Sequence, residues 1–170
     1  FVGRNEEFQS FVNEVAAIAI DRTGGINDLA EAPMADGKAV GDTLTDLIAR
    51  VGENMSLRRM QSIEGETVVS YVHNAAAPGM GKIGVLVAMN GGNEELGKQI
   101  AMHIAASQPL AVDRESIPAE AVEKEKAIFL DQAKNEGKPE NIAEKIVEGR
   151  LEKYYQENCL LEQAFVKNPD

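Results

Sequence analysis

The sequence has no tryptophan, and its aromatic residues amount to only 5% of 170 positions. Any hydrophobic core must therefore consist mainly of Ala, Val, Ile, Leu and Met side chains. Hydrophobic residues make up 44% of the chain, which is long enough for one compact domain or two small lobes. This composition is typical of a globular protein and argues against a disordered one.

Cysteine and long apolar runs are also scarce. The single Cys159 has no internal disulfide partner, which favours a reducing compartment and hence a cytoplasmic location. No local base stands beside this thiol in the sequence, so a nucleophilic role is not expected. Because no segment reaches the ~20 apolar residues of a membrane span, we expect no membrane association, and we expect no signal peptide.

Basic residues are fewer than acidic ones. The 17 Lys and Arg residues face 28 Asp and Glu residues, giving a net charge of −11. Contacts to nucleic-acid phosphates need a cationic surface, and Arg58-Arg59 is the only adjacent basic pair. Direct binding of nucleic acid is therefore not expected.

Three segments, 5–20, 38–51 and 94–107, show the apolar spacing of amphipathic helices. Their stripes are Phe8, Phe11, Val12, Val15 and Ala19; Val40, Leu44, Leu47, Ile48 and Val51; and Leu96, Ile100 and Ile104. Thr23–Gly25 should end the first helix, with a loop containing Pro33 and Gly37 after it. Gly52 is expected to cap the second helix.

Strand patterns occupy the middle of the chain. Segments 57–63 and 67–73 flank Glu64-Gly65-Glu66 and predict a β-hairpin, followed by a loop over 74–81. Segment 83–89 alternates but is apolar on both faces, which predicts a largely buried strand. Strands and helices in separate blocks predict an α+β fold with antiparallel sheet.

The segment from Pro118 to Phe165 predicts two long helices. Gly137 and Pro139 are a stop and a start signal two positions apart. The helices at 118–136 and 139–156 should therefore form a protruding antiparallel hairpin. Such an arm is better suited to gripping a partner than to enclosing a substrate.

No motif in the chain predicts catalysis or a metal site. Gly79–Gly84 matches G-x-G-x-x-G but precedes a strand instead of opening a helix, which favours a plain loop. His73 and His103 are the only histidines, and neither has a partner at a metal-ligand spacing. His103 lies on a helical apolar face and should be packed, whereas His73 is as well explained by surface exposure as by a contact. No cofactor, metal or enzymatic activity is expected.

Several segments, in order and in register, make the chain similar to the bacterial translation elongation factor Ts family. The matching segments are Phe1–Asn5, Val51–Met55 with Arg58-Arg59, Tyr71–His73, Gly81–Val87, Ile100–Ala106 and Gly137–Arg150. The resemblance covers essentially the whole chain.

The resemblance implies a guanine nucleotide exchange factor for the GTPase elongation factor Tu, with a core of two related α+β lobes. It implies that Phe1, followed by Val2, wedges between two helices of the GTPase domain near its magnesium site. It also implies that Val51 and Gly52 contact the same domain and that His73 lies at a second part of the interface.

The resemblance divides the chain into a first core lobe (1–80), the start of a second lobe (81–117), the helical arm (118–157) and a return segment (158–170). An N-terminal helical module and a closing C-terminal strand of the family have no counterpart, so we expect a fragment of a longer protein. Three alternatives stay open: an acidic scaffold without exchange activity, a dinucleotide enzyme using Gly79–Gly84, and a homodimer.

Overall fold

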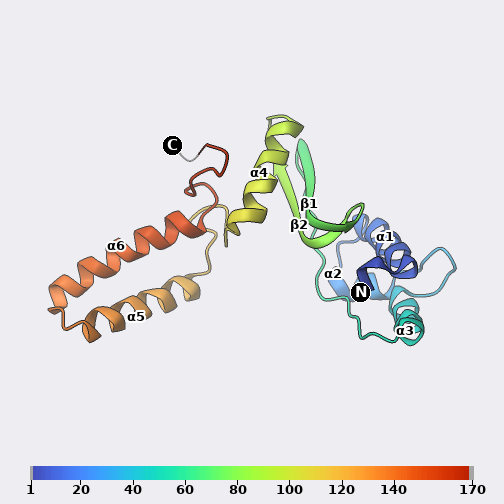
Figure 1. The fold of residues 1–170 in the computed structure, drawn as a ribbon, viewed down its shortest axis with the longest axis horizontal. Helices are drawn as coiled ribbons and strands as arrows, with labels where there is room; N and C mark the ends of the chain where they lie inside the picture. Colours follow the sequence, from blue (N-terminus) through green and yellow to red (C-terminus); the bar gives the residue numbers. More distant parts are fainter. Residues whose placement is uncertain (1, 169–170) are drawn as a thin grey trace. The chain divides into compact units, whose positions relative to one another are not determined.

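A computed structural model of the chain describes residues 2–168 (Figure 1). Its fold is mixed α+β, as expected, with one two-stranded antiparallel sheet in the described residues. The chain divides into two compact units, residues 1–101 and 102–170. The lobe and arm boundaries drawn from the resemblance remain predictions.

The first unit begins with the 3-10 helix η1 (Val2–Arg4) and α1 (Glu6–Ile20). The side-chain oxygen of Asn5 accepts a hydrogen bond from the backbone N–H of Phe8 at 3.0 Å, which caps α1. Glu6 and Glu7 in the first turn interact favourably with the helix dipole. These local signals explain why the predicted helix at 5–20 is confirmed.

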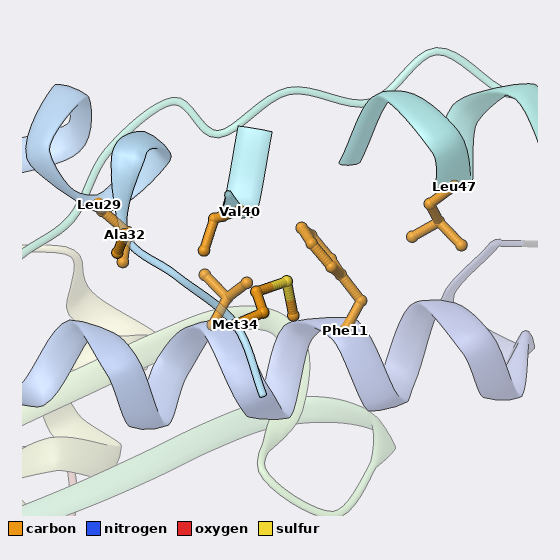
Figure 2. Packing of buried hydrophobic residues seen from close by; sticks show 7 residues of the cluster. Phe11, Leu29, Ala32, Met34, Val40 and Leu47 are labelled. Carbon is orange, nitrogen blue, oxygen red and sulfur yellow. The ribbon is translucent and has the colours of Figure 1, made fainter. Parts of the chain in front are cut away.

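The core of this unit lies between α1, α2 (Gly25–Glu31) and α3 (Val40–Val51). Figure 2 shows Phe11 of α1 directed toward Val40 and Leu47 of α3. The buried cluster comprises Phe11, Val15, Leu29, Ala32, Met34, Val40 and Leu47. As the composition predicts, most of these side chains are aliphatic, and Phe11 is the aromatic member of the buried cluster, with the partly buried Phe8 packed against it.

Helix α2 falls where a loop was expected. Seven residues are too few for a helix that is stable on its own, so its sequence carries little signal. Leu29 is nevertheless buried in the cluster, and Ala32 and Val40 are joined by a backbone hydrogen bond of 2.9 Å. Tertiary packing therefore stabilises this helix.

The β-hairpin consists of β1 (Thr67–Ala77) and β2 (Met80–Met89). The predicted hairpin around residues 64–66 is wrong, because the chain turns at Pro78-Gly79, where Gly79 has φ +73°. The expected loop over 74–81 is therefore mostly strand. Residues 57–63 form no strand; instead, Leu57 and Met60 pack against the helical core.

Only one face of the hairpin is buried, so the prediction of burial on both faces of 83–89 is also wrong. Val69 and Val87 are paired and buried, and α4 (Glu94–Ser107) approaches this face closely at Gly97. A Cβ on Gly97 would lie 2.7 Å from Val69, so glycine permits this approach. On the opposite face, Leu86 is 47% exposed.

In the second unit, α5 (Ala119–Asn135) and α6 (Glu140–Asn158) lie side by side (Figure 1). Gly137, with φ +72°, ends α5 in a turn that returns a hydrogen bond of 2.9 Å to Lys134. Ala133 and Ala143 are fully buried and let the two helices pack closely.

Backbone hydrogen bonds join the base of this helix pair to the segment that follows it. Residues 111 and 159 form a parallel bridge, and the N–H of Leu160 donates to the carbonyl of Ala111 at 2.9 Å. His103 is 2% exposed, as predicted for a packed histidine. Its Nδ1 accepts from the N–H of Val166 at 3.2 Å, and its Nε2 bonds Gln163 at 3.0 Å.

Candidate protein-contact site

The predicted contact residues lie on three different elements of the first unit. Phe1 lies outside the described residues. Val2 is half-buried in η1, and its carbonyl accepts the N–H of Asn5 at 2.8 Å. A Cβ on the neighbouring Gly3 would lie 3.7 Å from the Cβ of Ala76, so η1 packs beside the end of β1.

Val51 and Gly52 form the end of α3. Val51 is half-buried and packs against the core cluster, which fixes the direction of the chain at this point. Gly52 is exposed, has φ +75°, and donates its N–H to the carbonyl of Ile48 at 2.9 Å. Val51 is thus anchored in the core, whereas Gly52 exposes backbone without a side chain, which another protein can approach closely.

His73 lies on β1 opposite Ile83, and its ring is half-buried. Its Nδ1 forms a hydrogen bond of 2.9 Å with the hydroxyl of Tyr71, two residues earlier on the same face. The two ring centroids are 5.9 Å apart. Tyr71 therefore orients His73, and the i,i+2 spacing of the two residues is the sequence signal that would have pointed to it.

The backbone beside His73 has an unusual conformation. Asn74 has φ +53°, which is uncommon for a residue other than glycine. The strand register shifts between Ala75 and Ala77, so β1 carries a bulge there. Bulges of this kind redirect the side chains around them and often lie next to functional sites.

No hydrogen bond or ion pair within residues 2–168 joins any two of Val2, Gly52 and His73. They are held in place by separate local devices, namely the 3-10 turn, the helix cap and the tyrosine bond. Such a set of separate points is suited to contacting an extended protein surface.

A groove of about 520 Å³, lined in part by Gly3 and Arg4 of η1, was not anticipated from the sequence. It lies between η1 and α1 on one side and the turn end of the β-hairpin on the other. Its lining includes Gly79, Met80, Gly81, Lys82 and Gly84. The G-x-G-x-x-G segment is therefore a hairpin turn and a strand, without the helix N-terminus that a dinucleotide fingerprint requires.

The described residues contain no group of three or more His, Cys, Asp or Glu side chains able to hold a metal ion. Cys159 is fully buried, and burial raises the pKa of its thiol, which lowers the fraction of reactive thiolate. No helix in the described part of the chain is long and apolar enough to cross a membrane.

Comparison with known proteins agrees with these observations. A family model described as "Elongation factor TS" matches residues 1–170. The chain is 54% identical over 170 residues to "Elongation factor Ts" of Ruegeria sp. (strain TM1040) and 53% identical over 172 residues to that of Roseobacter denitrificans. A relative from Rhizobium etli is 47% identical over 178 residues. Each comparison covers 100% of this chain and 58% of the relative.

Proposed function

This chain belongs to the elongation factor Ts family, and from that premise we propose that it acts as part of a guanine nucleotide exchange factor for elongation factor Tu. The observation that carries the proposal is the family match along all 170 residues. The chain spans 58% of its relatives' length, so the activity belongs to the whole protein. The proposed setting is the cytoplasm, without direct contact to nucleic acid or membrane.

The proposed mechanism is differential binding and involves no bond chemistry. The factor binds the GTPase more tightly when nucleotide and magnesium are absent. By reciprocity, it then weakens nucleotide binding by the same factor by which nucleotide weakens its own binding. It does so through contacts made with only one of the two GTPase conformations.

Phe1 is the proposed wedge near the magnesium and phosphate site of the GTPase. Burying a Phe ring is worth roughly 1.5–3 kcal/mol, which corresponds to about one to two decades in an equilibrium constant. Val2, Val51 and Gly52 would contact the same GTPase domain. His73, oriented by Tyr71, would contact a second part of the partner.

The proposed architecture follows the family. Two related lobes form the core, and residues 118–157 form a helical arm that anchors the partner, with residues 158–170 returning to the second lobe. The burial of Ala133 and Ala143 on either side of the turn at Gly137 supports a hairpin whose two helices pack closely near its tip.

Release of a fluorescent GDP analogue from elongation factor Tu tests the proposal. We expect the protein to accelerate release and Phe1→Ala to lose about ten- to a hundredfold of that acceleration, with a smaller loss of binding. Ile20→Ala is the matched control, because Ile20 is a 77% exposed apolar side chain far along α1.

Two other outcomes would contradict the proposal. Tight binding of the GTPase without faster GDP release would indicate an acidic scaffold. No effect of Phe1→Ala on release would remove Phe1 from the mechanism. Analytical ultracentrifugation of the same preparation separates a monomer from the homodimer that the sequence leaves open.

A further inference from the structure

The groove beside η1 has an apolar floor and a cationic rim. Phe8 and Val12 of α1 line one side, and Val72 of β1 and Met80 of β2 line the other. Arg4 and Lys82 line it as well, and both are exposed. Among residues 2–168, no Asp or Glu lines the groove.

The groove is lined by these two cations although the chain carries a net charge of −11. In residues 2–101, the described ion pairs engage Arg22, Lys38, Arg50 and Lys98. Neither Arg4 nor Lys82 forms an ion pair within the described residues. Among the described residues, the charged side chains that line the groove are therefore two cations without an ion-pair partner, which suits an anionic ligand group.

Gly84 leaves the groove open. It pairs with Val72 across the hairpin, and a Cβ at this position would meet no atom within 4 Å. Its φ lies outside the left-handed region that favours glycine. A larger side chain would therefore be accommodated by the strand and would project into the empty space of the groove.

We propose that this groove receives an apolar segment of the GTPase that carries carboxylates. Its apolar side chains would pack against Phe8 and Val72, and its carboxylates would pair with Arg4 and Lys82. The inference rests on the proposed function. It extends the contact proposed at Val2, because η1 supplies both Val2 and the Arg4 side of the groove.

Filling the groove tests the apolar part of the proposal. Gly84→Leu should weaken binding to nucleotide-free elongation factor Tu by about tenfold or more, since it occupies the space that the partner segment needs. Ser70→Leu is the matched control, because Ser70 is an exposed residue of the same outer strand face that does not line the groove. Equal affinities of both variants and the parent would overturn the proposal.

Charge reversal tests whether Arg4 and Lys82 contribute to binding. Arg4→Glu and Lys82→Glu should each weaken binding by about two- to fivefold, mainly through slower association, and should reduce its dependence on salt. Arg58→Glu is the control, because Arg58 is exposed, lies outside the groove and forms no ion pair in residues 2–168. If all three variants slow association equally, the effect depends only on the net charge of the protein, and the proposal is overturned.

The groove proposal and the proposed function can be contradicted by different results. If the parent protein accelerates GDP release while the groove variants match it, only the groove proposal fails. If the parent protein leaves GDP release unchanged, the proposed function fails. Groove variants that lose self-association and keep full affinity for the GTPase would assign the groove to a second copy of the chain, against the proposal.

Discussion

At the scale of single residues, the structure distinguishes the proposed contact residues from the neighbours that hold them in position. His73 is a predicted contact, but its ring position depends on the 2.9 Å bond from Tyr71. Val51 points into the helical core and so holds Gly52 at the surface. His73 and Gly52 thus each have a neighbour whose loss is expected to weaken binding indirectly.

Gly52 allows stability and binding to be separated. Because its φ is +75°, Gly52→Ala should lower the free energy of unfolding by about 1 kcal/mol. Gly52→Asn should recover much of that loss, since asparagine tolerates the left-handed conformation. Urea denaturation measures this effect.

The affinity of the Gly52 variants for the GTPase is the second quantity to measure. If the partner approaches the bare backbone, Gly52→Asn should still bind weakly despite its restored stability. Full recovery of affinity by the asparagine variant would show that Gly52 acts only as a helix cap.

At the scale of elements, α5 and α6 depend on small residues where they meet. Ala133 and Ala143 are fully buried, and Val147 lies one turn beyond Ala143 on α6. The chain has no tryptophan and few other aromatic residues to fill a wider gap. Close packing of alanine is therefore how this helix pair buries apolar surface.

Overpacking this contact should loosen the pair. Ala143→Leu should destabilise it by about 1–3 kcal/mol, because the added atoms have no space. Ala127→Leu, at an exposed position of α5, adds the same atoms without a clash and should change stability by less than about 0.5 kcal/mol. Thermal unfolding followed by circular dichroism compares the two variants, and equal melting curves would contradict the role of alanine.

Arg114 joins three segments at the base of the helix pair. Its guanidinium donates two hydrogen bonds of 2.8 Å to Glu152 of α6 and also binds Glu162 of the following segment. It also stacks 4.6 Å from the ring centroid of Tyr155. This bidentate geometry is specific to arginine and gives the base of the pair one defined arrangement.

The same cluster predicts a pH dependence. Hydrogen bonds from Arg114 lower the pKa of Glu152 and of Glu162. A carboxyl whose pKa is lower in the folded state contributes stability above its unfolded value, about 4.3, and loses it as the pH falls through the folded value. Stability should therefore drop below about pH 4.3, and Arg114→Ala should make that drop shallower.

Denaturation midpoints measured between about pH 6 and about pH 3 test this expectation. Lys153→Ala is the control, because it removes one exposed ion pair of 3.6 Å to Glu157 and leaves the Arg114 cluster intact. An Arg114→Ala profile parallel to that of the parent protein would show that the cluster does not contribute to acid sensitivity.

At the scale of the whole molecule, each of the two compact units is stabilised by its own set of contacts. The buried helical cluster of the first unit lies entirely within residues 11–47. The second unit is held by α5 against α6, by the Arg114 cluster and by His103 with its two hydrogen bonds. Damage to one set of supports should therefore leave the other set in place.

Replacing residues 120–156 by a short Gly/Ser linker tests that independence. Amide hydrogen exchange in α1 and α3 should be unchanged, because none of their core partners is removed. Affinity for the GTPase should fall, because the proposed arm is gone. Inserting the same linker beside Gly137 keeps both helices and is the control. Loss of protection in α1 and α3 would show that the arm is structural.

Local signals in the sequence are enough to predict much of the chain. The helix at 94–107, the helix starting after Asn5 and the left-handed cap at Gly52 each follow from residues within a few positions of one another. The family resemblance indicates Val2, Val51, Gly52 and His73, but not Tyr71 and not the groove. Helix α2 is not predicted, because its stability comes from contacts outside its own seven residues.

The pairing of β1 with β2, the single buried face of their hairpin and the groove were decided by tertiary structure alone. Glu64-Gly65-Glu66 and Pro78-Gly79 are both suitable turns by composition, and only the packing of Leu57 and Met60 on the helical core excludes the first. Arg4 and Lys82 are 78 positions apart, so no local pattern can bring them to one groove. The physical reason is general. Helix capping and hydrophobic periodicity act within a few residues of one another. The pairing of strands and the formation of a groove depend instead on which apolar surfaces, distant in sequence, are buried from water together.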